Sequence, residues 1–166
     1  MDLELFSGNA LSVVDAKGRM SLPSSFRAVV ASRMGLPGDA NGAVLIGEHK
    51  LQPCLQGFDK SYQKLLYTRL QEEVAKSGSD SFSDDLDERF AETFGNPESV
   101  SYDGVGRMVL PLGLREFAGL DAPGSVALIT AAADTFRIWN LDKYRAAYAD
   151  KPNMLRIVDR LKDPRK

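Results

Sequence analysis

Cysteine and histidine are almost absent from this chain of 166 residues, which contains one of each. The single cysteine, Cys54, excludes an internal disulfide framework and a cysteine-rich zinc site. The single histidine, His49, leaves no support for a histidine-centred metal cluster or for the common hydrolase chemistries. We therefore expect no metal and no cofactor. We expect His49 to be a solvated turn residue and Cys54 to be a small buried hydrophobic residue.

Long hydrophobic runs are also missing. No stretch approaches the ~20 apolar residues that a membrane-spanning helix requires. The N-terminus lacks the basic start and apolar run of a signal peptide. We therefore expect a cytoplasmic protein that does not engage a membrane. Hydrophobic residues make up 43% of the chain and charged residues 27%, which is typical of a globular protein with one ordinary domain or two small ones.

Charge is distributed unevenly, although the net charge is only -2. Residues 15–38 carry four basic side chains against one acidic one, residues 71–103 two against ten, and residues 137–166 nine against four. Because nucleic-acid binding follows a local patch, the small net charge does not exclude it. The acidic run 80–92 lacks calcium-loop spacing and is interpreted as a solvated helix face. The basic end 156–166 is interpreted as a frayed tail in preference to an accessory phosphate contact.

A duplicated motif organises the sequence. Residues 15–27 align without gaps with residues 103–115, and seven of the thirteen pairs are identical, where about one is expected by chance. Similarity continues between residues 43–46 and 126–129, so each half is interpreted as one copy of the same unit. The identical pairs are Asp15/Asp103, Gly18/Gly106, Arg19/Arg107, Met20/Met108, Leu22/Leu110, Pro23/Pro111 and Arg27/Arg115.

Each unit is predicted to contain a strand, a tight turn, a strand, a short helix, a second strand pair and a longer helix. In the turn, Asp can bond the backbone and Gly can take positive φ. In the first copy these elements fall at residues 8–14, 15–18, 20–22, 26–34, 43–46 with 51–55, and 62–74. In the second copy the strands fall at 100–102, 108–110, 126–131 and 136–139, with a helix at 112–118 and a last helix from 144 that Pro152 should break.

The two copies are joined by an acidic segment. Residues 77–80 form a cluster of helix-breaking residues, and Leu86, Phe90 and Phe94 at steps of four then predict an amphipathic helix. We therefore expect a first module at residues 1–76 and a helical linker at 77–97. A second module with a C-terminal helix and basic tail is expected at 98–166.

The repeated Asp-x-x-x-Arg spacing has two interpretations. Asp15 with Arg19, and Asp103 with Arg107, can hold the register of a tight turn through a surface ion pair of ~0.2–1 kcal/mol. Alternatively, the arginines contact a partner. The residues alone leave both interpretations open.

Taken in order, Phe6-Ser7-Gly8 and the two copies of the motif at 15–27 and 103–115 resemble the MraZ family of bacterial transcription regulators. The resemblance covers nearly the whole chain. It implies an α+β fold, β-rich with short helices, in which tandem AbrB-like swapped-hairpin modules form a pseudo-two-fold double-psi-type barrel. It also implies a homo-oligomeric ring of about eight or more subunits. Such a ring would bind repeated boxes upstream of its own cell division and cell wall operon, in association with the nucleoid.

The resemblance also assigns roles to single residues. It implies that Lys17 and Arg19 meet phosphates or guanine edges of double-stranded DNA, and that Arg107 takes the corresponding place in the second copy. Val105 stands where the first copy has Lys17, so we expect the first copy to contact DNA more strongly.

Other motif residues have supporting or undecided roles. Arg27 and Arg115, on the short helix of each copy, are interpreted either as DNA contacts or as members of intersubunit ion pairs. The residues expected to support the two turns are Asp15, Gly18, Asp103 and Gly106.

Three classes of function are considered. We predict a sequence-specific DNA-binding regulator. The alternative is a ring-forming scaffold or protein-interaction module in which the Asp–Arg pairs are structural. An enzyme finds no support, because the sequence has no known nucleophile spacing, glycine-rich phosphate loop or metal-ligand set.

Overall fold

The computed structural model describes residues 3–38, 40–78, 82–94 and 96–166. Ser79 and Asp80 of the expected breaker cluster lie outside this range, and the side chain of Phe94 is not described. The strands are β1 (Asn9–Val14), β2 (Arg19–Ser21), β3 (Gly42–Glu48), β4 (Leu55–Phe58), β5 (Glu98–Tyr102), β6 (Arg107–Val109), β7 (Ser125–Ala132) and β8 (Thr135–Asn140). The helices are α1 (Ser24–Met34), α2 (Lys60–Ser77), α3 (Phe82–Phe94), α4 (Leu112–Ala118), α5 (Leu141–Ala147) and α6 (Pro152–Asp159).

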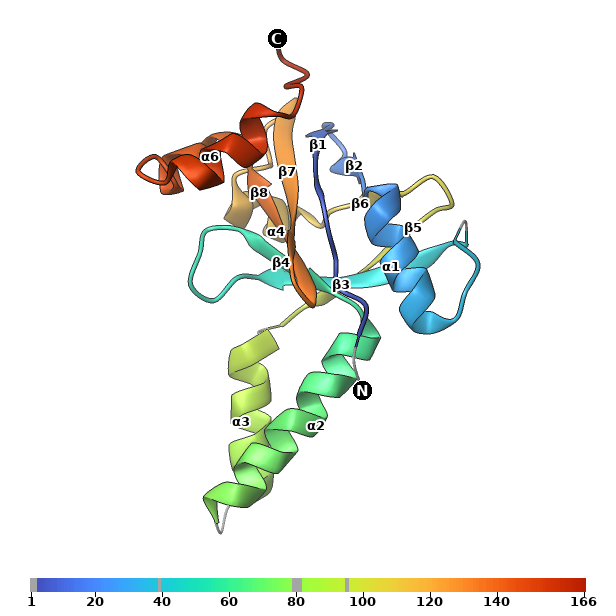
Figure 1. Ribbon diagram of the computed structural model, residues 1–166, viewed down its shortest axis with the longest axis vertical. Coiled ribbons are helices and arrows are strands. Elements are labelled where there is room, and N and C mark those ends of the chain that lie inside the picture. Colours follow the sequence, from blue (N-terminus) through green and yellow to red (C-terminus); the bar gives the residue numbers. More distant parts are fainter. Residues whose placement is uncertain (1–2, 39, 79–81, 95) are drawn as a thin grey trace.

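Within the described residues, eight antiparallel strands form one sheet in the order β1-β7-β8-β4-β3-β5-β6-β2 (Figure 1). The strands at the two ends of this order, β1 and β2, are consecutive in the chain and are joined by the turn at residues 15–18. The backbone N–H of Ser21 donates to Ser12 Oγ at 3.0 Å across the seam between them. The sheet therefore curls into a nearly closed barrel.

Most of this strand pairing is preserved when the two copies are exchanged; the exception is the β5–β6 pair, whose counterpart, β1 with β2, is the open seam. In this exchange each strand of the first copy changes places with its equivalent in the second, β1 with β5 and so on to β4 with β8. The β1–β7 pair then becomes β5–β3 and the β3–β4 pair becomes β7–β8, and all four pairs are observed. The β2–β6 and β4–β8 pairs map onto themselves. In β2–β6, Met20 lies opposite Met108, and these are equivalent positions of the repeat. A pseudo-two-fold axis therefore passes through this pair, and the expected α+β barrel is confirmed.

One hydrophobic core fills the barrel with side chains from both copies. Phe6, Phe26 and Phe136 meet there with ring centroids 5.3 to 5.5 Å apart. Met20 and Met108 also point into this core and are buried. Because both copies contribute, neither motif has a core of its own.

Helices α1 and α4 leave the barrel directly after β2 and β6. Each is preceded by a proline, Pro23 or Pro111, and ends at a left-handed glycine, Gly35 or Gly119. At the end of α1 the Leu36 N–H bonds Ala31 O, as in a Schellman cap. These local signals explain why both helices end where the sequence predicts and why α4 also begins there, whereas α1 begins at Ser24, two residues before the predicted start.

Helices α2 and α3 form an arm that projects from the barrel (Figure 1). Asp59 caps α2 by accepting a hydrogen bond from the Tyr62 N–H at 2.9 Å. The two helices are held together by Leu70 and Val74 of α2 and Leu86 of α3, with Leu66 and Phe90 at the edge of the contact. None of the helices in the described ranges is long and apolar enough to cross a membrane.

The sequence prediction of a strand at residues 51–55 is wrong for most of its length. Residues 51–54 form a bend, so β4 begins only at Leu55. The bend is closed by the His49 N–H on Cys54 O at 2.9 Å, and His49 Nδ1 accepts from the N–H groups of Leu51 and Gln52 at 3.1 Å each. His49 is therefore a half-buried turn residue rather than a solvated one. Cys54 is buried as expected, and burial raises the pKa of its thiol to about 12.

The C-terminal end is folded rather than frayed. Helix α5 ends at Ala147, and Pro152 begins α6 instead of terminating a helix, because its missing N–H is not needed in a first turn. Arg165 then bonds both carboxylate oxygens of Asp142, at 2.9 and 3.1 Å, and also bonds Asp163. Val158 of α6 is buried, which fastens this end to the barrel.

Candidate nucleic-acid interface

The first motif forms a tight turn built around one carboxylate. Asp15 Oδ1 accepts the N–H groups of Lys17 and Arg19 at 2.9 Å each, and Asp15 Oδ2 accepts Arg19 Nε at 2.5 Å. Gly18 has a φ of 82°, the left-handed conformation that this turn requires. The turn therefore needs Asp at its start and Gly at its third following position.

The second motif repeats this geometry. Asp103 Oδ1 accepts the N–H groups of Val105 and Arg107 at 3.1 and 3.0 Å, and Asp103 Oδ2 accepts Arg107 Nε at 2.7 Å. Gly106 has a φ of 89°. The ion pair anticipated by the structural interpretation of the motif is thus present in both copies.

These bonds stabilise the ionised form of both carboxylates. The backbone N–H and then the side chain of Arg19 lower the pKa of Asp15. The side chain of Arg107 is the main cause of the lowered pKa of Asp103. Each arginine uses its Nε in the pair, and among the described residues no partner meets its terminal nitrogens. The side chains of Arg19 and Arg107 are 59% and 73% exposed. Each ion pair therefore orients its guanidinium and leaves the terminal nitrogens available to a partner.

Strand pairing brings the two motifs together. In the antiparallel β2–β6 pair of the sheet, which we call the β2–β6 ribbon, Arg19 lies opposite Val109 and Ser21 lies opposite Arg107. Because Met20 and Met108 face the core, these four residues share the outward face. The two arginines are diagonal neighbours on that face. A hollow of about 510 Å³ borders it, lined in part by Arg19, Arg107 and Asp103.

The two turn tips differ in charge. Lys17 is exposed at the first tip, and Val105 is exposed at the equivalent place on the second. Around the ribbon there are thus three basic side chains, Lys17, Arg19 and Arg107, against the two motif aspartates. The surface is only weakly positive and is more basic on the side of the first copy.

Arg27 and Arg115 lie behind the two turns and bind the chain's own backbone. Arg115 is only 8% exposed and donates through Nε to Leu110 O at 2.9 Å. Arg27 donates through Nε to Leu22 O at 3.1 Å and through Nη1 to Gly104 O at 2.8 Å. The sequence predicts either DNA contacts or intersubunit ion pairs for these two arginines. It does not predict the bonds to backbone carbonyl oxygens that the structure shows.

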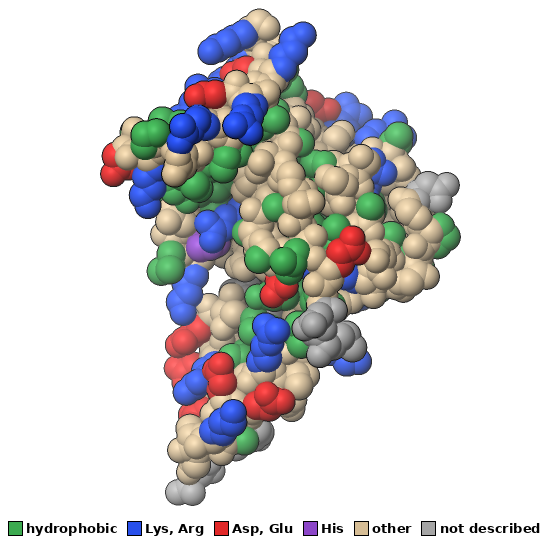
Figure 2. Space-filling model, viewed as in Figure 1, with side chains coloured by type: hydrophobic (Ala, Val, Ile, Leu, Met, Phe, Trp, Pro, Cys, Tyr) green, Lys and Arg blue, Asp and Glu red, His purple; other side chains and the backbone are tan. Residues whose placement is uncertain are grey.

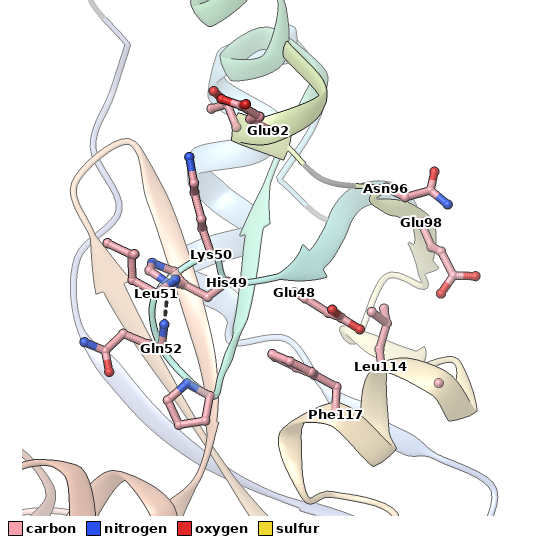
Figure 3. A pocket seen from close by; sticks show the side chains of 13 residues that line it. Glu48, His49, Lys50, Leu51, Gln52, Glu92, Asn96, Glu98, Leu114 and Phe117 are labelled. Atoms are coloured by element: carbon pink, nitrogen blue, oxygen red, sulfur yellow. Dashed lines mark hydrogen bonds between the residues drawn. The ribbon is translucent and has the colours of Figure 1, made fainter. Parts of the chain in front are cut away.

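A separate hollow of about 840 Å³ lies between the β3–β4 loop, α3 and α4 (Figure 3). Lys50 extends from the loop toward Glu92 at the end of α3, while Glu48 faces Phe117 and Leu114 of α4. Among the described residues no group of three His, Cys, Asp or Glu side chains is placed to hold a metal ion. Sequence reasoning did not single out this hollow, because its lining comes from three distant segments.

Further basic side chains gather around α6 and the C-terminal end (Figure 2). The α2–α3 arm, by contrast, carries acidic and basic side chains side by side in the same view. Lys151, Arg156 and Arg160 are exposed in and beside α6. This second basic surface belongs to the fastened C-terminal end rather than to a free tail.

Curated proteins similar to this chain share one name. A "Transcriptional regulator MraZ" of Gluconobacter oxydans is 33% identical over 138 residues, which cover 83% of this chain and 77% of that protein. A protein of the same name from Ruegeria sp. is 30% identical over 161 residues, covering 95% and 89%. One from Pseudomonas fluorescens is 29% identical over 146 residues, covering 87% and 86%. No protein-family model matches the chain.

Proposed function

Because the chain belongs to the MraZ family, whose curated members are named transcriptional regulators, we propose that it regulates transcription by reading double-stranded DNA with the β2–β6 ribbon. The observation that carries the proposal is the strand register, which places Arg19 and Arg107 on one outward face. A two-stranded antiparallel ribbon has the dimensions to enter the major groove of B-DNA.

The motif geometry suits arginine for base reading. Nε of each guanidinium is held by its aspartate, which leaves the terminal nitrogens of Arg19 and Arg107 for a partner. An oriented guanidinium can donate two bonds to O6 and N7 of a guanine, an arrangement worth about 1–3 kcal/mol of discrimination. Lys17 is a point charge at the turn tip and contacts a phosphate in this proposal.

The two copies present different side chains to DNA, so the proposed contact is asymmetric. The first copy offers Lys17 and Arg19, while the second offers Val105 and Arg107. The first copy therefore supplies more of the phosphate attraction, and the second contributes mainly through its arginine. A chain with this polarity distinguishes the two orientations of its binding site.

A weakly positive ribbon binds firmly only if several ribbons act together. We propose a homo-oligomeric ring of about eight or more subunits whose ribbons engage repeated boxes at once. In this proposal the boxes lie upstream of the protein's own cell division and cell wall operon, and the protein is cytoplasmic and nucleoid-associated. Lys17, Arg19 and Arg107 are the contacting residues, supported by Asp15, Gly18, Asp103 and Gly106.

A scaffold function is the second candidate. The observation in its favour is that both motif arginines already bond an aspartate within the chain. In that case the pairs serve the turns alone, and the protein assembles without sequence-specific DNA binding.

A salt-series titration separates the two functions. Wild type, Arg19→Ala and Lys17→Ala are titrated with duplex from upstream of the operon and with a scrambled duplex. Arg19→Ala should lose about 10- to 100-fold in affinity for the native duplex only. Lys17→Ala should weaken binding to both duplexes and reduce the slope of log affinity against log salt by about 0.9 for each Lys17–phosphate contact in the bound complex.

The control is Arg89→Ala, which removes an exposed arginine on α3, paired with Glu73 at 3.6 Å and located on the projecting arm. It should bind both duplexes as wild type does. Light scattering verifies that all variants keep the same assembly. If wild type binds neither duplex, or binds both equally, the regulator proposal fails and the scaffold remains.

A further inference from the structure

Each motif turn rests on an arginine of the other copy. Building on the proposed DNA-binding function, we propose that Arg27 and Arg115 are crossed positioning residues: Arg115 holds the first turn in its reading position, and Arg27 holds the second. Neither arginine touches DNA in this arrangement.

The first turn docks on the corner between β6 and α4. The Leu110 N–H donates to Gly18 O at 2.9 Å, and Arg115 Nε donates to Leu110 O at 2.9 Å. A Cβ on Gly18 would lie only 2.5 Å from Arg115 Nε and 2.8 Å from Leu110 O. The buried guanidinium therefore fills the space beside Gly18 and abuts the residue that precedes Arg19.

The second turn docks in the same way on the corner between β2 and α1. The Leu22 N–H donates to Gly106 O at 2.8 Å, and Arg27 Nε donates to Leu22 O at 3.1 Å. A Cβ on Gly106 would lie 2.4 Å from Leu22 O and 2.7 Å from Arg27 Nε. Arg27 also bonds Gly104 O inside the turn itself, at 2.8 Å.

Arginine suits this role better than lysine. Its planar guanidinium can lie flat against a glycine while its N–H groups meet carbonyl oxygens in fixed directions. A lysine keeps the charge but has neither the plane nor the Nε donor. In Arg115 the guanidinium is also buried, where an unbonded charge is strongly unfavourable, so it stays on Leu110 O.

The consequence for function is a crossed dependence. A base contact by Arg19 or Arg107 needs its turn placed within a fraction of an ångström. Because Arg115 is packed against Gly18, it controls the placement of Arg19, and Arg27 controls Arg107 in the same way. Neither module can hold its own reading turn without the other.

Double-mutant cycles test this crossing with charge-preserving variants. Arg115→Lys should lower affinity for the native duplex about tenfold and leave the slope of log affinity against log salt unchanged. Combined with Arg19→Ala, it should add little further loss, whereas combined with Arg107→Ala the two losses should multiply. Arg27→Lys should show the opposite preference, with a shared loss for Arg107→Ala and an independent one for Arg19→Ala.

A second measurement needs no DNA. The N–H groups of Lys17 and Arg19 are held by Asp15, so hydrogen exchange reports on the first turn. Arg115→Lys should speed exchange at these two amides, and Arg27→Lys should do so at Val105 and Arg107. Hydrogen exchange tests the crossed positioning even if the protein does not bind the native duplex. A failure of the regulator proposal can therefore be distinguished from a failure of the positioning proposal.

The outcomes are decisive in both directions. A drop of about 0.9 or more in the salt slope for Arg115→Gln, which removes the charge, would mean that Arg115 contacts phosphate directly, and this would overturn the proposal. Equal coupling to Arg19 and Arg107, or faster exchange in the turn of the same copy, also overturns it. If Arg115→Lys does not fold, the less deeply buried Arg27→Lys carries the same test from the other side.

Discussion

Alanine at Gly18 probes the close packing between the first turn and Arg115. Gly18 has a φ of 82°, and a Cβ there would lie 2.5 Å from Arg115 Nε. Gly35, at the end of α1, has a φ of 68° but nothing within 4 Å of the position its Cβ would take. Gly35→Ala is therefore a matched control, because it shares the backbone strain and lacks the collision.

The expected magnitudes follow from this difference. A left-handed non-glycine residue costs about 1–2 kcal/mol, and both variants incur that cost. Gly18→Ala must also displace the guanidinium from Leu110 O, and a hydrogen bond to a charged group is worth about 1.5–3 kcal/mol. We expect Gly18→Ala to lower the free energy of unfolding by about 3–5 kcal/mol, against about 1–2 kcal/mol for Gly35→Ala.

Urea unfolding at one fixed protomer concentration measures both variants, since assembly makes stability depend on concentration. Midpoints are converted with the slope of each transition, and an unchanged slope shows that the same surface unfolds. Equal losses for the two variants would show that the guanidinium does not occupy the space beside Gly18 in solution. The packing argument for Arg115 would then fail.

Three further outcomes are expected. The Cys54 thiol, whose pKa is raised to about 12 by burial, should resist a thiol reagent at neutral pH until urea unfolds the chain; rapid labelling of the native protein would contradict its burial. Arg33→Ala should lower the free energy of unfolding by about 3–5 kcal/mol in the same assay, because it leaves the buried Asp59 carboxylate without the guanidinium that lies 3.3 Å away. A loss below about 1 kcal/mol would refute this. Because the pKa of Asp15 is lower in the folded protein than its ordinary value of 3.8, its pair with Arg19 stabilises the fold fully at pH values above 3.8. This stabilisation is lost as the pH falls through the lowered pKa of the folded state. Asp15→Asn should therefore flatten the acid limb of stability against pH, and an unchanged limb would contradict the pairing.

Local structure was predictable where a single residue sets it. Pro23 and Gly35 bracket α1, and Asp15 with Gly18 define the first turn, because each acts on backbone within a few residues. Strand partners were not predictable in this way. β1 pairs with β7 from the other end of the chain, and alternation of apolar residues sets which face is buried but not which strand lies beside it.

The positions of Arg27 and Arg115 illustrate the same limit at the site. Local spacing places each on a short helix after a proline, where exposure is the ordinary expectation for arginine. Their burial against carbonyl oxygens follows from docking between the copies, which no local pattern encodes. One signal was nevertheless present: both copies keep the glycine and the arginine that turn out to be packed together across the pseudo-two-fold axis.

The pairing that gathers the motif arginines also limits what one chain can bind. Each arginine carries its own aspartate, so the ribbon and its two turns have three basic side chains against two acidic ones. Neutralising about one phosphate yields little of the counterion release that gives DNA-binding proteins their affinity. Base recognition and affinity therefore arise at different levels in the proposed function. The paired arginines of one chain supply recognition, and affinity comes from the number of ribbons that a ring applies to repeated boxes at the same time.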